Sequence, residues 1–131
     1  MSLLLDTHYV FAIAGSPGTL TSVEREFLQS FKQRFVVSAV SIWEIRLKWH
    51  SFHRSGTGKG PKGPGEIVHI LSSQPIYFLA LSPAHAATVL ELPLLHKDPF
   101  DELLLAQAQS EGLSLFSRDR ALAGHPLVTS L

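Results

Sequence analysis

The chain has 131 residues, of which 45% are apolar, so it can bury one substantial core, and we expect a single domain over residues 1–131. Its 11 Lys and Arg residues balance 11 Asp and Glu residues, which excludes a strong overall attraction to nucleic acid or to a membrane surface. The absence of cysteine excludes disulfides, thiolate nucleophiles and cysteine-based zinc sites, and it favours a cytoplasmic location.

The first half of the chain predicts alternating strands and helices. The apolar opening stretch contains Asp6 and is too short to cross a bilayer, so it predicts a buried strand at 3–5 and a helix that ends near Gly15. The remaining elements expected here are a helix at 22–32 behind a capping box of Thr21 and Glu24, a strand at 35–38, and a helix from Ser41 to about His53, whose own capping box is Ser41 and Glu44.

The second half continues this alternation after a segment rich in Gly, Pro and Lys. Residues 54–66, "RSGTGKGPKGPGE", predict a flexible basic loop. After it we expect a short helix at 67–71, a strand at 76–81, a helix from Ser82 to about Leu92, a helix from Asp98 to Glu111 that ends at Gly112, a strand at 113–117, a short helix at 120–123 and a strand at 127–128. Such alternation predicts a three-layer α/β/α fold with a central, mostly parallel sheet.

Acidic residues recur where the predicted strands end. Asp6 follows the first strand, Glu44 lies in the first turn of the helix after the second strand, and Asp119 follows the strand at 113–117. Asp98 and Asp101 open the helix that leads into that strand. Ligands of open parallel sheets bind beyond the carboxyl ends of the strands, so these acids are candidates for one shared site.

Each of these acids also has a local explanation as a helix cap or as a favourable charge near a helix N-terminus. Glu24 serves as an internal control, because it has capping-box spacing but follows a turn rather than a strand. If the other acids converge, their like charges raise one another's pKa unless a cation neutralises them. Carboxylate oxygens suit Mg²⁺ or Mn²⁺, and one or two such ions could activate a water for attack on a phosphodiester.

Four stretches of the chain together resemble a known family. They are "LLLDTH" at 3–8, "VSAVSIWEI" at 37–45, "HKDPFDELLLAQA" at 96–108 and "LSLFSRD" at 113–119, and their order and separations are similar to those of the PIN-domain ribonucleases, in particular the VapC-type toxins of toxin–antitoxin pairs. The resemblance implies a PIN fold, Mg²⁺- or Mn²⁺-dependent endoribonuclease activity, a homodimer, and inhibition by a cognate antitoxin protein that covers the acidic groove.

The resemblance also assigns roles to individual residues. It implies that the catalytic acids and metal ligands are Asp6, Glu44, Asp101 and Asp119. Asp98, Thr7 and Ser117 take supporting roles, by capping or by hydrogen bonding to the acids. Glu102 departs from the family, which commonly has a basic residue there, and it adds negative charge beside the site. The alternative is therefore a PIN-fold module of weak or no activity that binds RNA or a partner protein.

Five basic residues gather in sequence around the third helix and the loop that follows it, and they either contact RNA phosphates or form a solvated face. They are Arg46, Lys48, Arg54, Lys59 and Lys62. Trp43 and Trp49 lie on one helical stripe, which favours the core or a dimer interface over a base-stacking platform.

Other site chemistries are disfavoured. "GTGKG" at 56–60 lacks the Ser or Thr that a phosphate-binding loop needs after its lysine, and His50 and His53 lack the further ligands of a zinc site. His8 is expected to pack rather than to act as a base, and it occupies the position where an aspartyl-phosphate enzyme would need a second aspartate after Asp6.

Overall fold

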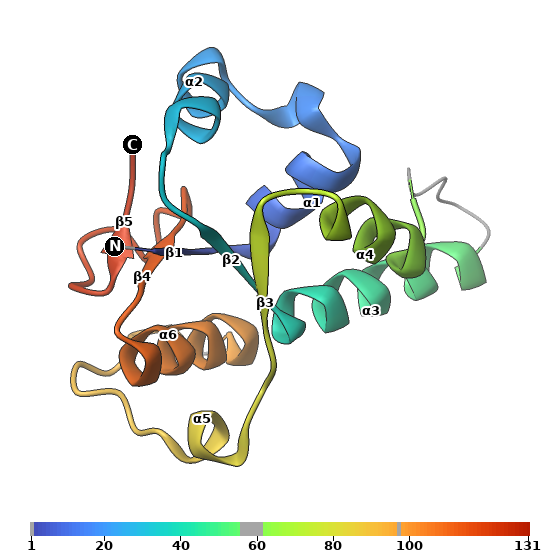
Figure 1. Cartoon of the computed structure of the whole chain (residues 1–131). Coiled ribbons are helices and arrows are strands. Elements are labelled where there is room, and N and C mark those ends of the chain that lie inside the picture. The colour runs from blue at the N-terminus through green and yellow to red at the C-terminus, as the bar shows by residue number, and fades with distance from the viewer. Residues whose placement is uncertain (1, 56–61, 97) are drawn as a thin grey trace.

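The computed structural model describes residues 2–55, 62–96 and 98–131 and has a five-stranded sheet at its centre. All neighbouring strands are parallel, in the order β3-β2-β1-β4-β5 (Figure 1). The strands are β1 (Leu3–Leu5), β2 (Phe35–Ser38), β3 (Ile76–Leu79), β4 (Ser114–Phe116) and β5 (Val128–Thr129). The predicted parallel sheet is confirmed, although β3 ends two residues early and β5 lies one residue later than expected.

Helices connect the strands and lie on both faces of the sheet (Figure 1). They are α1 (Thr7–Gly15), the 3-10 helix η1 (Pro17–Thr19), α2 (Ser22–Ser30), α3 (Ala39–Ser55), α4 (Pro64–Ser72), α5 (Pro83–Ala87) and α6 (Pro99–Glu111). Within the described residues, no helix is long and apolar enough to cross a membrane.

The alternation of side chains along β1 separates two apolar cores. Leu3 and Leu5 pack on one face with residues of α1 and α4, whereas Leu4 packs on the other face with residues of α6. Successive strand residues point to opposite faces, so a strand whose residues are all buried needs a helical layer on each side. The predicted three-layer α/β/α arrangement is therefore confirmed.

The start of α3 differs from the prediction. The helix begins at Ala39 rather than at Ser41, because the hydroxyl of Ser38 at the end of β2 accepts a hydrogen bond from the Val40 amide at 2.9 Å. Ser41 and Glu44 thus form no capping box, and Glu44 lies in the second turn of the helix. The Ser41 hydroxyl instead lies 3.0 Å from that of Thr7, which ties α3 to α1.

The predicted loop at 54–66 is shorter in the structure. At its two ends α3 continues to Ser55 and α4 begins at Pro64, three residues before the predicted helix. The residues between them, 56–61, lie outside the described part of the chain.

Two of the expected helices are shorter or absent. The helix after Ser82 ends at Ala87 rather than Leu92, because the backbone at the β-branched Thr88 is already extended. Residues 120–123 form hydrogen-bonded turns rather than a helix, since Gly124 follows with a φ of 88°, which ends any helical path. The long helix α6 is as predicted and ends at Gly112, which has a φ of 68°.

Candidate active site

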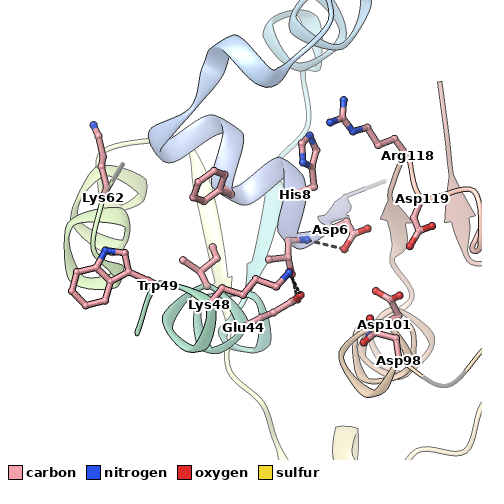
Figure 2. A pocket seen from close by; sticks show the side chains of 13 residues that line it. Asp6, His8, Glu44, Lys48, Trp49, Lys62, Asp98, Asp101, Arg118 and Asp119 are labelled. Atoms are coloured by element: carbon pink, nitrogen blue, oxygen red, sulfur yellow. Dashed lines mark hydrogen bonds and ion pairs between the residues drawn. The ribbon is translucent and has the colours of Figure 1, made fainter. Parts of the chain in front are cut away.

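Three aspartates from separate elements meet beyond the carboxyl ends of the central strands. Asp6 follows β1, Asp119 follows β4, and Asp101 lies in the first turn of α6. From β1 the chain builds the sheet first toward β3 and later, through β4, in the other direction, so β1 and β4 flank the topological switch point, where parallel sheets bind ligands. Figure 2 shows the three carboxylates directed toward a common space.

Asp6 is held firmly by its neighbours. Its carboxylate accepts a hydrogen bond from the Thr7 amide at 2.8 Å and one from the Ser117 hydroxyl at 2.5 Å. Burial raises the pKa of Asp6, and these two hydrogen bonds oppose the rise because they stabilise the charged form. Ser117 also accepts a hydrogen bond from the Asp119 amide at 3.1 Å, so this one hydroxyl links two of the three aspartates.

Asp101 is oriented by the residue that starts its helix. Asp98 caps α6, as expected, by accepting hydrogen bonds from the amides of Phe100 at 2.9 Å and Asp101 at 3.3 Å. The pKa of Asp101 is raised to about 7, first by burial and then by the nearby charges of Asp6, Asp98 and Asp119. The aspartates are therefore close enough to resist simultaneous ionisation.

Glu44 lines the same pocket but is engaged by other partners. Its Oε1 accepts a hydrogen bond from the Thr7 hydroxyl at 2.7 Å, and its Oε2 lies 2.9 Å from Lys48 Nζ. Figure 2 shows Glu44 turned toward Lys48. Of the four predicted acids, the structure brings three together and holds the fourth at the side of the pocket. Thr7 and Ser117 both hydrogen-bond to acids, which was one of the two alternatives considered for each.

The pocket around these acids has a volume of about 510 Å³. Its remaining lining residues are Thr7, His8, Phe11, Ile45, Lys48, Trp49, Lys62, Asp98 and Arg118. Among the basic residues singled out in the sequence, Lys48 and Lys62 thus reach the pocket. Arg46 does not line it, and its guanidinium lies 5.0 Å from the centre of the Trp43 ring. Lys59 and the side chain of Arg54 lie outside the described residues.

Arg118 is a pocket residue that the sequence analysis missed. Its Nη1 lies 3.2 Å from Oε1 of Glu24, whose Oε2 accepts a hydrogen bond from the Tyr9 hydroxyl at 2.6 Å. Glu24 forms the predicted capping box with Thr21, but it is also buried and holds an arginine at the pocket, so it does more than cap. The sequence did contain a signal for this role, because Arg118 lies between Ser117 and Asp119, two residues that were assigned to the site.

Two histidines near the acids were also missed as site residues. Nε2 of His96 lies 3.7 Å from Oδ2 of Asp101, and burial lowers the pKa of His8, which lines the pocket. Among the described residues, neither buried Nε2 atom, of His8 or of His96, has a hydrogen-bond partner. His96 therefore presents a nitrogen close to Asp101, and His8 contributes to the wall of the same pocket.

The fit of this pocket to a divalent metal depends on its donor atoms. Within the described residues, no group of three or more Asp, Glu or His side chains is already arranged to hold an ion. The chemistry of the donors nevertheless fits, because Asp6, Asp101 and Asp119 present hard oxygen atoms in one pocket and repel one another without a cation. Asp101, with its pKa of about 7, must lose a proton when a metal binds.

Comparison with known proteins identifies the family. A search among curated proteins finds no match. A toxin–antitoxin complex from Klebsiella pneumoniae is similar, with 19% identity, a TM-score of 0.63 and coverage of 97% of this chain and 95% of that one. VapBC2 from Rickettsia felis, bound to a promoter DNA fragment, is also similar, with 16% identity, a TM-score of 0.68 and coverage of 100% of this chain and 98% of that one. VapC20 of Mycobacterium tuberculosis, described as a toxin that cleaves the sarcin-ricin loop, has 13% identity, a TM-score of 0.59 and coverage of 93% of this chain and 95% of that one. The model of the PIN domain family matches residues 3–125, and the chain therefore belongs to that family.

Proposed function

We propose that this chain is a divalent-metal-dependent endoribonuclease and the toxin of a VapBC-type toxin–antitoxin pair. The observation that carries the proposal is the shared pocket of Asp6, Asp101 and Asp119, in which the pKa of Asp101 is raised to about 7. Carboxylates brought together at this electrostatic cost are typical of a site that binds a cation.

In this proposal Asp6, Asp101 and Asp119 hold Mg²⁺ or Mn²⁺, and Glu44 contributes as the fourth acid. When bound, the ion lowers the pKa of a water and stabilises negative charge on an RNA phosphodiester. Ser117 keeps Asp6 ionised and directed into the pocket through its 2.5 Å hydrogen bond, and Thr7 positions Glu44. Lys48 and Lys62 offer positive charge to the RNA backbone where they line the pocket.

The biological setting is part of the same proposal. The similar structures from Klebsiella pneumoniae and Rickettsia felis are toxin–antitoxin assemblies, so we assign this chain an antitoxin protein as partner. A single PIN domain over residues 1–131, a homodimer and a cytoplasmic location complete the proposal.

The test combines metal binding with RNA cleavage. Calorimetric titration of Mn²⁺ into the chain is expected to show binding, and the same protein is expected to cleave single-stranded RNA only when the metal is present. Asp101→Asn removes one proposed ligand and is expected to abolish cleavage. Glu91→Gln is the control, because Glu91 is an exposed carboxylate that does not line the pocket. Full activity of Asp101→Asn would refute the site assignment.

The second candidate is a PIN-fold module that binds RNA or a protein without cutting RNA. It is favoured by the engagement of Glu44 with Lys48 and Thr7 and by the exposed Glu102 beside the aspartates. A chain that binds RNA but shows neither Mn²⁺ binding nor cleavage would support this candidate over the nuclease.

A further inference from the structure

The pocket has a second half whose chemistry differs from that of the aspartates. Phe11 of α1 and Ile45 and Trp49 of α3 supply apolar surface, and Lys62 supplies a positive charge. Figure 2 shows Trp49 and Lys62 at the end of the pocket that lies away from Asp101 and Asp119. A bound metal ion would not require an aromatic and basic surface at the far end of the pocket from Asp101 and Asp119.

The volume of the pocket exceeds what an ion requires. An octahedral ion with its waters occupies roughly 200 Å³, at about 30 Å³ for each water. The pocket measures about 510 Å³, so more than half of it remains for another group. The remainder is suited to one flat organic group of the size of a nucleotide.

The aromatic and basic side chains each lie next to a glycine of a neighbouring segment. A methyl group added at Gly63 would lie 3.5 Å from Cζ2 of Trp49, and one added at Gly15 would lie 3.5 Å from Cδ of Lys62. The indole therefore rests beside the backbone at the start of α4, and the stem of Lys62 rests on the end of α1. Trp49 thus lies beside the start of α4 and Lys62 beside the end of α1, and both line the pocket.

We propose that this half of the pocket is a nucleobase-binding subsite for single-stranded RNA, with Trp49 as the stacking surface and Lys62 as a contact for the adjoining phosphate. The inference rests on the proposed function and extends it to the kind of substrate. Aromatic stacking accepts every base, because every base has a π face, whereas a duplex cannot place a base in a pocket without first breaking a pair. The site therefore takes unpaired RNA and reads little of its sequence.

The charges along the pocket support this choice of ligand. Lys62 lies on the aromatic side and Asp6, Asp101 and Asp119 lie on the other side, with Lys48, paired to Glu44, between them. A nucleotide with its base on Trp49 would place phosphates between the lysines and a metal held by the aspartates, so that both of its charged neighbours attract it. The aromatic side chain of a protein partner could also stack on Trp49, but it would bring no phosphate to pair with the charge of Lys62.

The experiment measures the binding of a nuclease-resistant, single-stranded 2′-O-methyl oligoribonucleotide by fluorescence anisotropy. Trp49→Ala is compared with Trp43→Ala, a matched control because Trp43 lies on the same helix, is 52% exposed and does not line the pocket. Trp49→Ala is expected to weaken binding roughly 5- to 100-fold, as loss of one stacked base does, and Trp43→Ala less than about 2-fold. Trp49→Phe is expected to restore most of the affinity.

A second arm separates stacking from phosphate contact. Oligonucleotides that lack one base at successive positions are expected to bind the wild-type chain more weakly at one position, and Trp49→Ala is expected to lose this dependence. Lys62→Met is expected to lower the dependence of log affinity on log salt by about 0.7, the value for one phosphate of a single strand, and to keep the effect of the missing base. The measurements on the wild-type chain and on Trp49→Phe remain decisive if Trp49→Ala does not fold.

The inference is overturned if both tryptophan variants weaken binding equally, or if no single missing base matters to the wild-type chain. Its failure is distinct from that of the proposed function. Metal-dependent cleavage by a chain whose Trp49 is indifferent to RNA would leave the nuclease and remove the subsite. Base-dependent binding at Trp49 without cleavage would keep the subsite and remove the nuclease.

Discussion

The hydroxyl of Ser117 donates a hydrogen bond to Oδ2 of Asp6 at 2.5 Å and so joins the ends of β4 and β1 across the switch point of the sheet. The same hydroxyl accepts a hydrogen bond from the amide of Asp119 at 3.1 Å. One buried serine thereby holds two of the candidate metal ligands in a fixed relation.

Ser117→Ala is expected to weaken Mn²⁺ binding about 10-fold near neutral pH, because groups that orient metal ligands commonly contribute that much. Without the hydrogen bond the pKa of Asp6 rises further, so more of the carboxyl is protonated. Ser114→Ala is the matched control, since Ser114 bonds to Thr129 and Leu127, away from the acids. Equal metal affinity in the two variants, measured by calorimetry, would contradict this prediction.

Metal-free protein is expected to lose stability as the pH rises from about 4 to 7. The pKa of Asp101 is raised from 3.8 to about 7 in the folded state, so in this range the folded chain binds the proton more strongly than the unfolded chain. Asp101→Asn removes the titration and is expected to make the metal-free chain more stable at pH 8 by about 2 kcal/mol, half of what three pKa units represent, because the new amide is itself a buried polar group. Urea unfolding in the presence of a chelator at pH 5 and pH 8 measures both effects, and a wild-type stability that does not change with pH would be inconsistent with them.

Glu24→Gln is expected to destabilise the chain by about 2 kcal/mol, because the buried carboxylate bonds to Tyr9, Thr21 and Arg118. Burial opposes the shift, but these partners lower the pKa of Glu24, so its contribution is present above the unfolded pKa and is lost as the pH falls through the folded pKa. Glu26→Gln, on the exposed side of the same helix, is the control and is expected to stay within about 0.5 kcal/mol. Similar unfolding midpoints for the two variants would show that the buried network is not stabilising.

Glu102→Lys is expected to strengthen RNA binding several-fold and to increase its salt dependence, because Glu102 is exposed directly beside Asp101 and the change replaces repulsion with attraction. Glu91→Lys makes the same change in charge at an exposed position that does not line the pocket. A comparable gain in both variants would assign the effect to net charge rather than to the site.

The local pattern of residues predicted most of the fold. Leu3 to Leu5 and α6 were identified correctly, because an all-apolar strand and a helix bounded by Asp98 and Gly112 depend on signals within a few residues. The start of α3 was wrong, because two serines compete for the cap and the hydrogen bond of Ser38 prevails. Which serine caps the helix depends on the backbone conformation at the end of the preceding strand, and the position of that strand in the sheet determines this conformation.

The acids at the strand ends were chosen from the sequence because the direction of a parallel strand places the residue that follows it at one edge of the sheet. By itself the sequence therefore determined the fold class, the PIN resemblance and the candidate acids. Only the tertiary structure decided that Asp6, Asp101 and Asp119 share a pocket while Glu44 pairs with Lys48, that Glu24 holds Arg118 at its rim, and that Trp49 lies in the same pocket. The physical reason is that side chains separated by tens of residues interact over a few ångströms, and only the packing of sheet and helices sets those distances.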